Sequence, residues 1–158
     1  MAKARTVPHL NPDQPLNICL LKIIRTRLSE MYSFEKGTIE GRNIECLHDM
    51  RVSSRRVQAA LKIFRGVFPQ RKFKSQYVRL RTLIRALGVV RHYDVFIDKL
   101  EKYRDKLSKS NKKALELLIV RQRNLREAKR KELISYMKHL EKTRFKDSFN
   151  RFITKSLA

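Results

Sequence analysis

A row of polar, mostly basic side chains recurs every three or four residues between positions 48 and 65. The row consists of His48, Arg51, Arg55, Gln58, Lys62 and Arg65. This spacing places the side chains along one flank of a helix, where at ~1.5 Å per residue they span roughly 27 Å. Because a planar guanidinium can contact two phosphate oxygens at once, arginine favours phosphate among anions. The row therefore predicts a site for an extended, phosphate-rich polyanion.

A second basic flank follows in the next helical segment, where Lys74, Arg81 and Arg85 recur at the same period. Solvated helix faces usually alternate in sign, but residues 48 to 92 hold twelve Arg and Lys and one acid, Asp49. We expect phosphates to lie in the groove between these two helices. The predicted polyanion-binding residues are His48, Arg51, Arg55, Arg56, Lys62, Arg81, Arg85 and Arg91.

Several charged residues admit a structural reading beside the functional one. His48 could be an ordinary histidine at the start of a helix, but its place beside Arg51 and Arg55 favours ligand binding. Asp94 is better read as a structural acid that pairs with Arg91 or orients another arginine. A further basic cluster spreads around its helix and is expected to be solvated surface. This cluster consists of Arg121, Arg123, Arg126, Lys129 and Arg130.

Enzyme motifs are missing from the chain. No GxxxxGK[ST], GxGxxG, GxSxG or HExxH pattern occurs in it. The one metal-like spacing, Glu45 to His48, has no second copy of the kind that di-iron bundles require. The prediction is a non-enzymatic protein with no catalytic residue, metal site or cofactor. An enzyme acting on phosphoanhydrides, with His48 as acid or base, is the alternative.

The composition bounds the class of protein and its partners. The chain has 158 residues, 38 Lys and Arg against 15 Asp and Glu, a formal charge of +23 and 42% hydrophobic residues. Such a charge calls for an anionic partner: nucleic acid, an anionic membrane or inorganic polyphosphate. Cys19 and Cys46 fall in apolar helical patterns and are expected to be small buried hydrophobes. No signal peptide or long apolar run occurs, which predicts a cytoplasmic protein without membrane binding.

The elements that must position these residues are helices, because four glycines and four prolines leave little material for hairpin turns. We expect a flexible lead-in at 1–12 and one helical domain at 13–158. Asp13 should cap a first helix that runs to Tyr32, followed by a loop at 33–42. Asn43 should cap a second helix that ends near Phe68. Later helices are expected at 71–87, ended by Gly88, at 90–107, at 111–142, and in a last short segment.

Apolar periodicity predicts which side chains face the core. The stripe of the second helix consists of Leu47, Met50, Ser54, Val57, Leu61, Phe64 and Phe68. The later helices should bury Tyr93, Ile97, Leu100, Tyr103, Leu115, Leu118, Leu125, Met137 and Leu140, and the last one Phe145, Phe149 and Phe152. Short loops between such helices predict an antiparallel bundle of five to six helices, similar to a four-helix bundle.

The segments HDMRVSSRRVQAALKIF and LRTLIRALGVVRHYDVFIDKL together resemble the CHAD module, the conserved histidine α-helical domain. His48, Arg51, Val52, Arg55 and Arg56 match its first motif. Leu87, Gly88, Arg91, Asp94 and Val95 match its second. The resemblance covers about residues 43 to 100. It implies a binding module for inorganic polyphosphate, associated with polyphosphate granules.

The chain departs from the family pattern in two ways. His92 stands where the family usually has an aspartate, which makes the site more positive. Family members also contain two similar helical halves, and this chain corresponds to the first half. We expect either a homodimer that polyanion strengthens or a piece of a longer protein. Nucleic acid is the alternative ligand, which the aromatic residues disfavour because they fall on or near the apolar seams. These are Phe64, Phe73, Tyr77, Tyr93 and Phe96.

Overall fold

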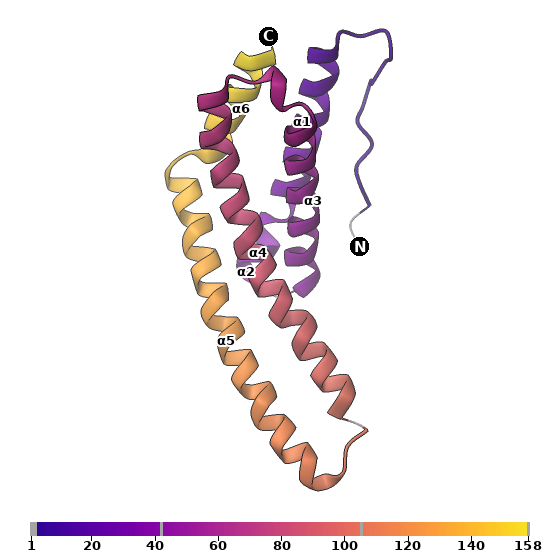
Figure 1. The fold of residues 1–158 in the computed structure, drawn as a ribbon, viewed down its shortest axis with the longest axis vertical. Helices are drawn as coiled ribbons and strands as arrows, with labels where there is room; N and C mark the ends of the chain where they lie inside the picture. The colour runs from indigo at the N-terminus through magenta and orange to yellow at the C-terminus, as the bar shows by residue number, and fades with distance from the viewer. Residues whose placement is uncertain (1–2, 42, 105, 158) are drawn as a thin grey trace.

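The computed structural model describes residues 3–41, 43–104 and 106–157, and these residues form six α-helices (Figure 1). The helices are α1 (Leu16–Ser33), α2 (Glu35–Glu40), α3 (Ile44–Ile63), α4 (Gln70–Arg104), α5 (Lys109–Lys142) and α6 (Phe145–Leu157). A 3-10 turn, η1 (Arg65–Val67), joins α3 to α4. No strand occurs among the described residues. The predicted all-α class is therefore confirmed.

The core lies where α1, α3, α4 and α6 pack together, at the upper end of the molecule in Figure 1. Its fully buried side chains include Leu20, Ile24, Met31, Met50, Val57, Leu61, Leu80, Leu83, Leu87, Phe145, Phe149 and Ile153. These residues recur at helical spacing in each segment, so the removal of apolar surface from water selects the faces that pack. The predicted burial of Phe145, Phe149 and Phe152 is confirmed.

The segment before α1 lies along that helix without forming a helix of its own. Lys22 Nζ donates to the carbonyl oxygen of His9 at 2.6 Å, and Arg27 Nη1 donates to that of Arg5 at 2.8 Å. Residues 1 and 2 lie outside the described part, and the division of the chain at residue 12 stays a prediction. Asp13 does not cap α1: its N–H donates to Asn11 Oδ1, and Pro15 precedes the first helical residue. The ψ of Pro15, 140°, is extended, so the helix begins only after it.

The predicted loop at 33–42 is wrong, because α2 occupies most of it; residue 42 lies outside the described residues. The hydroxyl of Thr38, a buried residue, donates to the Phe34 carbonyl. Gly41 ends α2 with φ at 70°, a left-handed conformation that glycine adopts without strain. Cys46 lies against Gly37, and both cysteines are free and half-buried rather than fully buried. A six-residue helix has too little periodicity to be read from sequence.

The start and the packing face of α3 follow the sequence closely. Asn43 caps the helix as predicted, since its side chain accepts a hydrogen bond of 2.8 Å from the N–H of Glu45. The apolar stripe from Leu47 to Leu61 is buried. Because this face is fixed in the core, the orientation of the basic flank beside it is fixed as well.

Gly88 does not end a helix, and the predicted break between two helices is wrong. α4 continues through this position as one helix of 35 residues. A glycine inside a helix costs about 1 kcal/mol relative to alanine, which burial of two or three apolar side chains exceeds. Leu87 and Val90 beside it are fully buried. Tertiary packing therefore overrides the local preference.

α4 and α5 form a long antiparallel hairpin whose lower half extends beyond the other helices in Figure 1. The predicted burial fails at several positions there. Tyr103 is 56% exposed, Leu118 38% and Leu125 41%, whereas Ile97 and Met137 are buried as expected. Two helices bury only the strip between them, so apolar residues on their other faces stay in solvent without a third helix.

Candidate functional site

The predicted groove lies between α3 and α4, which run side by side in opposite directions. Gln58 Nε2 donates to Tyr77 Oη at 3.1 Å near one end, and Arg91 Nη1 lies 3.8 Å from Glu45 Oε1 near the other. Because the two helices are antiparallel, a residue one turn earlier in α3 lies opposite a residue one turn later in α4. This register places Arg55 level with Arg81, and Arg51 level with Arg85 and Gly88.

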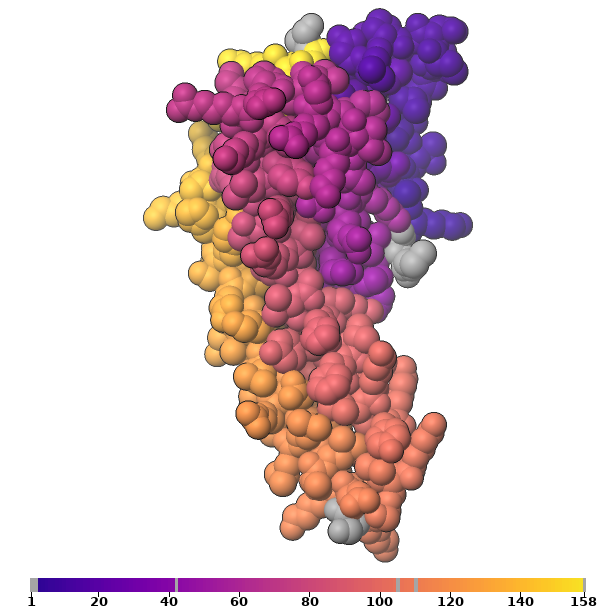
Figure 2. All heavy atoms as spheres, viewed as in Figure 1, coloured from indigo at the N-terminus to yellow at the C-terminus, as the bar shows by residue number. Residues whose placement is uncertain are grey.

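Five predicted cations of this groove have no carboxylate within 4 Å among the described residues. They are Arg51, Arg55, Lys62, Arg81 and Arg85, and all except the half-buried Arg51 are exposed. In Figure 2, α3 and α4 lie at the front of the molecule with no other element over the seam between them. The seam between α3 and α4 is therefore exposed, and within the described part of the chain these five cations have no neighbouring acid.

Arg51 lies beside Gly88 of α4. A Cβ at position 88 would lie 3.7 Å from Arg51 Nε, which is an ordinary van der Waals distance. The space at this position therefore accepts a small side chain, and Arg51 packs next to the middle of α4.

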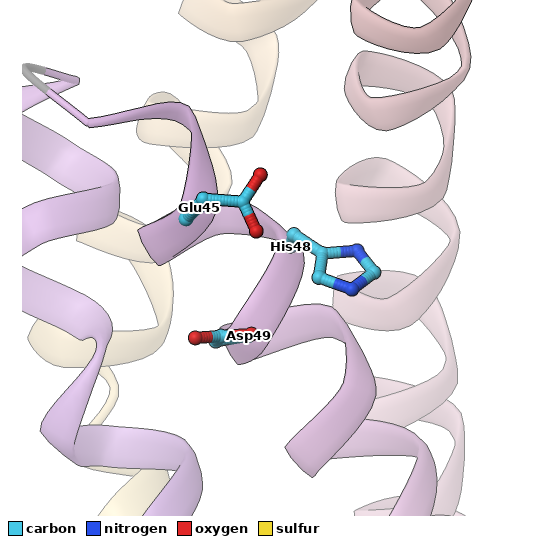
Figure 3. Close-up of side chains that lie close together, drawn as sticks. All are labelled: Glu45, His48 and Asp49. Carbon is cyan, nitrogen blue, oxygen red and sulfur yellow. The ribbon is translucent and has the colours of Figure 1, made fainter. Parts of the chain in front are cut away.

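His48 lies at the end of the groove, one turn before Arg51. Figure 3 shows its ring directed toward α4. Its Nδ1 is buried and has no hydrogen-bond partner among the described residues. The neutral ring has one donor and one acceptor nitrogen, and the protonated ring has two donors, so the side chain can hydrogen-bond a phosphate in either form when Nε2 carries a proton.

Arg56 points to the opposite side of α3 and holds a buried acid. Its Nη1 lies 2.5 Å from Glu30 Oε1, and Arg27 Nη1 lies 2.9 Å from Glu30 Oε2. The Glu30 side chain is 1% exposed, so both of its oxygens are neutralised inside the protein. The structure does not bring Arg56 together with the groove cations, and its side chain stabilises the packing of α1 on α3.

Two other predicted residues take part in ion pairs. Arg91 contacts Glu45 across the end of the groove at 3.8 Å. Asp94 is buried and accepts a hydrogen bond of 2.8 Å from Arg126 Nε, which confirms that it orients an arginine. Arg126 itself is 21% exposed and paired, so the prediction that it belongs to a solvated cluster is wrong. Asp94 thereby joins α4 to α5 rather than contributing to the groove.

Glu45, His48 and Asp49 place one potential metal ligand each within 4.8 Å of the others. Figure 3 shows the carboxylate of Asp49 pointing away from the His48 ring. Glu45 lies beside the Arg91 guanidinium, which competes with a metal ion for its carboxylate. Because this guanidinium already lies on the Glu45 carboxylate, we assign no metal to the three side chains.

A hollow of about 530 Å³ on α4 was not predicted from the sequence. It is lined by Arg85, Gly88, Val89, His92, Tyr93, Phe96 and Gln122. Phe96, one of the aromatic residues expected mostly on or near the apolar seams, is 38% exposed at the edge of this hollow. The spacing of Arg85, Val89, His92 and Phe96 along one helix face was the signal available in the sequence.

Comparison with known proteins gives one match. The family model of the CHAD domain matches residues 22–158. No curated protein and no solved structure matches the chain. Within the described residues, no helix combines the length and the apolarity needed to cross a bilayer.

Proposed function

Because the chain belongs to the CHAD domain family, which is linked in general to polyphosphate binding, we propose that it is a non-enzymatic module that binds inorganic polyphosphate. The ligand lies along the groove between α3 and α4. Its phosphates contact Arg51, Arg55, Arg81 and Arg85, with Lys62 at one end and His48 at the other. Arg56 and Arg91 support these contacts by positioning the helices.

One observation carries the proposal: Arg51, Arg55, Arg81 and Arg85 have no acid partner among the residues that the structure describes, although carboxylates neutralise Arg56 and Arg126 elsewhere. Arg51, Arg55, Arg81 and Arg85 bring four guanidinium groups to two facing helix turns, where their mutual repulsion opposes folding. A chain of phosphates removes this repulsion and accepts two hydrogen bonds from each planar fork. From His48 to Lys62 the groove spans about 21 Å at ~1.5 Å per residue, which suits a linear ligand.

The test is a calorimetric titration with long-chain polyphosphate. Arg51→Ala and Arg85→Ala should each weaken binding several-fold while the helical circular dichroism signal is retained. Arg121→Ala is the matched control, since Arg121 is exposed on α5 away from the groove. Equal losses in all three variants would mean that binding reflects net charge and not the groove.

Absence of catalysis is part of the proposal and has its own check. Incubation of the protein with polyphosphate and magnesium, followed by an orthophosphate assay, should release no phosphate above the blank. Release that disappears in His48→Ala would replace the binding module with an enzyme acting on phosphoanhydrides.

We also propose that two copies of the chain pair through a bound polyanion. Binding to polyphosphate would place the protein on polyphosphate granules in the cytoplasm. One groove leaves the outer side of a bound phosphate chain uncovered, and a second copy related by a twofold axis would cover it. Light scattering should report a mass that doubles when polyphosphate is added. A mass that stays at one copy throughout would refute the dimer and leave the groove untouched.

Nucleic acid is the second candidate ligand, and the exposure of Phe96 beside the groove favours it. Proteins that bind single strands place exposed rings among their cations. Competition between polyphosphate and an oligonucleotide of matched charge separates the two candidates. Polyphosphate should displace the oligonucleotide completely if it is the preferred ligand.

A further inference from the structure

The hollow on α4 combines side chains that suit a planar, hydrogen-bonding ligand. The Tyr93 and Phe96 rings supply apolar walls, and Phe96 is 38% exposed. Gln122 reaches the hollow from α5 and offers amide donors and an acceptor. The volume of about 530 Å³ lies within the range of small-molecule sites, about 300–1,000 Å³.

The hollow has a basic rim. Arg85 supplies a guanidinium, His92 adds an imidazole, and no carboxylate is among the lining residues. A purely apolar hollow would suit a packed helix, whereas a guanidinium at its rim suits an anionic ligand with one apolar, planar part. In Figure 2 the atoms of α4 lie at the front of the molecule without another element over them.

The hollow adjoins the proposed groove through two residues. Arg85 and Gly88 line the hollow, and Gly88 also lies beside Arg51 of α3. A ligand whose phosphates contact the groove arginines can therefore extend into the hollow without crossing another helix. The part that enters the hollow meets rings and an amide in place of guanidinium groups.

We propose that this hollow binds a nucleobase, so that the chain takes nucleoside phosphates whose phosphates lie at the end of the groove. The base stacks on Phe96, its polar edge meets the amide of Gln122, and the phosphates meet Arg85 and His92. This inference rests on the proposed function, because the groove supplies the phosphate contacts. A free nucleotide and the end of a single strand share this chemistry.

The experiment compares ATP with tripolyphosphate, which carries the same row of three phosphates without a base. Calorimetric titrations are made at one salt concentration in magnesium-free buffer. Stacking of one base adds about tenfold or more to affinity, so ATP should bind about tenfold more tightly than tripolyphosphate. Phe96→Ala should remove this advantage and leave the affinity for tripolyphosphate unchanged.

Two further variants sharpen the result. Phe96→Tyr keeps a stacking ring and should retain the preference for ATP. Tyr103→Ala is the matched control, because Tyr103 is an exposed ring on the same helix that does not line the hollow. It should bind both ligands like the unaltered protein.

A short oligonucleotide with one terminal phosphate distinguishes the two sources of the base. If Phe96→Ala weakens ATP and leaves the oligonucleotide unaffected, the ligand is a free nucleotide. If it weakens the oligonucleotide alone, the ligand is a strand end. Either pattern supports base recognition.

The proposal would be overturned if ATP and tripolyphosphate bind equally and Phe96→Ala also leaves the oligonucleotide affinity unchanged. Equal loss of ATP and tripolyphosphate binding in Phe96→Ala would overturn it as well. The proposal would also be overturned if Phe96→Ala altered only the oligomer mass in light scattering and left the affinities for both ligands unchanged. The hollow would then be covered by a second copy. These failures leave the groove intact if tripolyphosphate binding still depends on Arg51. Loss of all phosphate binding would instead refute the proposed function.

Discussion

Arg55 and Arg56 are adjacent in the sequence and identical in chemistry, yet the structure assigns them opposite roles. Arg55 is exposed in the groove, without a carboxylate within 4 Å among the described residues. Arg56 lies 2.5 Å from the buried Glu30. Arg55→Ala should therefore impair binding of polyphosphate, and Arg56→Ala should impair stability.

The magnitude for Arg56→Ala follows from the burial of Glu30. Removing one partner of a buried ion pair costs about 3–5 kcal/mol, because the other charge is left uncompensated. Arg27 still contacts Glu30 at 2.9 Å, so we expect the lower end of this range, about 3 kcal/mol. At about 2–4 °C per kcal/mol for a chain of this size, the melting temperature should fall by about 6–12 °C.

The magnitude for Arg55→Ala follows from the loss of one phosphate contact. Each neutralised phosphate contributes about 0.7 to the slope of log affinity against log salt, so the slope should become shallower by about 0.7. The melting temperature should stay within about 2 °C of the unaltered protein, as for most surface substitutions. Arg56→Ala should leave the slope unchanged at a temperature where it is folded.

Thermal unfolding followed by circular dichroism at 222 nm and calorimetric titration at several salt concentrations measure both quantities. Arg56→Lys serves as a further control, because lysine retains the charge beside Glu30. An Arg56→Ala protein that melts normally and no longer binds would refute this reasoning. A destabilised Arg55→Ala protein with normal binding would refute it equally.

Three other predictions concern the whole groove, its glycine and a buried acid. If about six phosphates are neutralised, log affinity for polyphosphate should fall with log salt at a slope of about −4; a slope near zero would contradict an electrostatic groove. Gly88→Ala should raise the melting temperature by about 2–4 °C with unchanged binding, because a Cβ at 88 only contacts Arg51 Nε at 3.7 Å; a lower melting temperature would contradict a continuous α4. Burial raises the pKa of Glu35, Glu141 adds to this and Lys146 opposes it, so ionisation of Glu35 costs folding free energy. Glu35→Gln should therefore raise the melting temperature at pH 7, and the gain should vanish as the pH falls toward 4; a constant difference would point to another cause.

Local features of the chain were predictable because they depend on neighbours in the sequence. The Asn43 cap needs only the amide two residues further on. The buried face of α3 needs only apolar residues at helical spacing, and this face fixes where Arg51 and Arg55 lie on the helix. The CHAD motifs occur in the same local segments.

Two failures of prediction share a cause, because each depends on an element that is distant in the sequence. Gly88 signals a helix end by local preference, but the burial of Leu87 and Val90 holds α4 together. Leu118 and Leu125 have the spacing of core residues and remain exposed, because no third helix covers that half of the hairpin. Periodicity identifies a face that can be buried; it does not supply the partner.

The sequence by itself determined that this protein is helical, strongly basic and equipped with arginines along α3, because composition and helical period are local properties. The tertiary structure alone decided which arginines are available to a ligand. Arg56 is held by Glu30, which lies 26 residues away on another helix, while Arg55 is exposed and has no carboxylate within 4 Å among the described residues. The physical reason is that a charge is neutralised by whatever lies within a few ångströms of it, and in this chain those neighbours come from other helices.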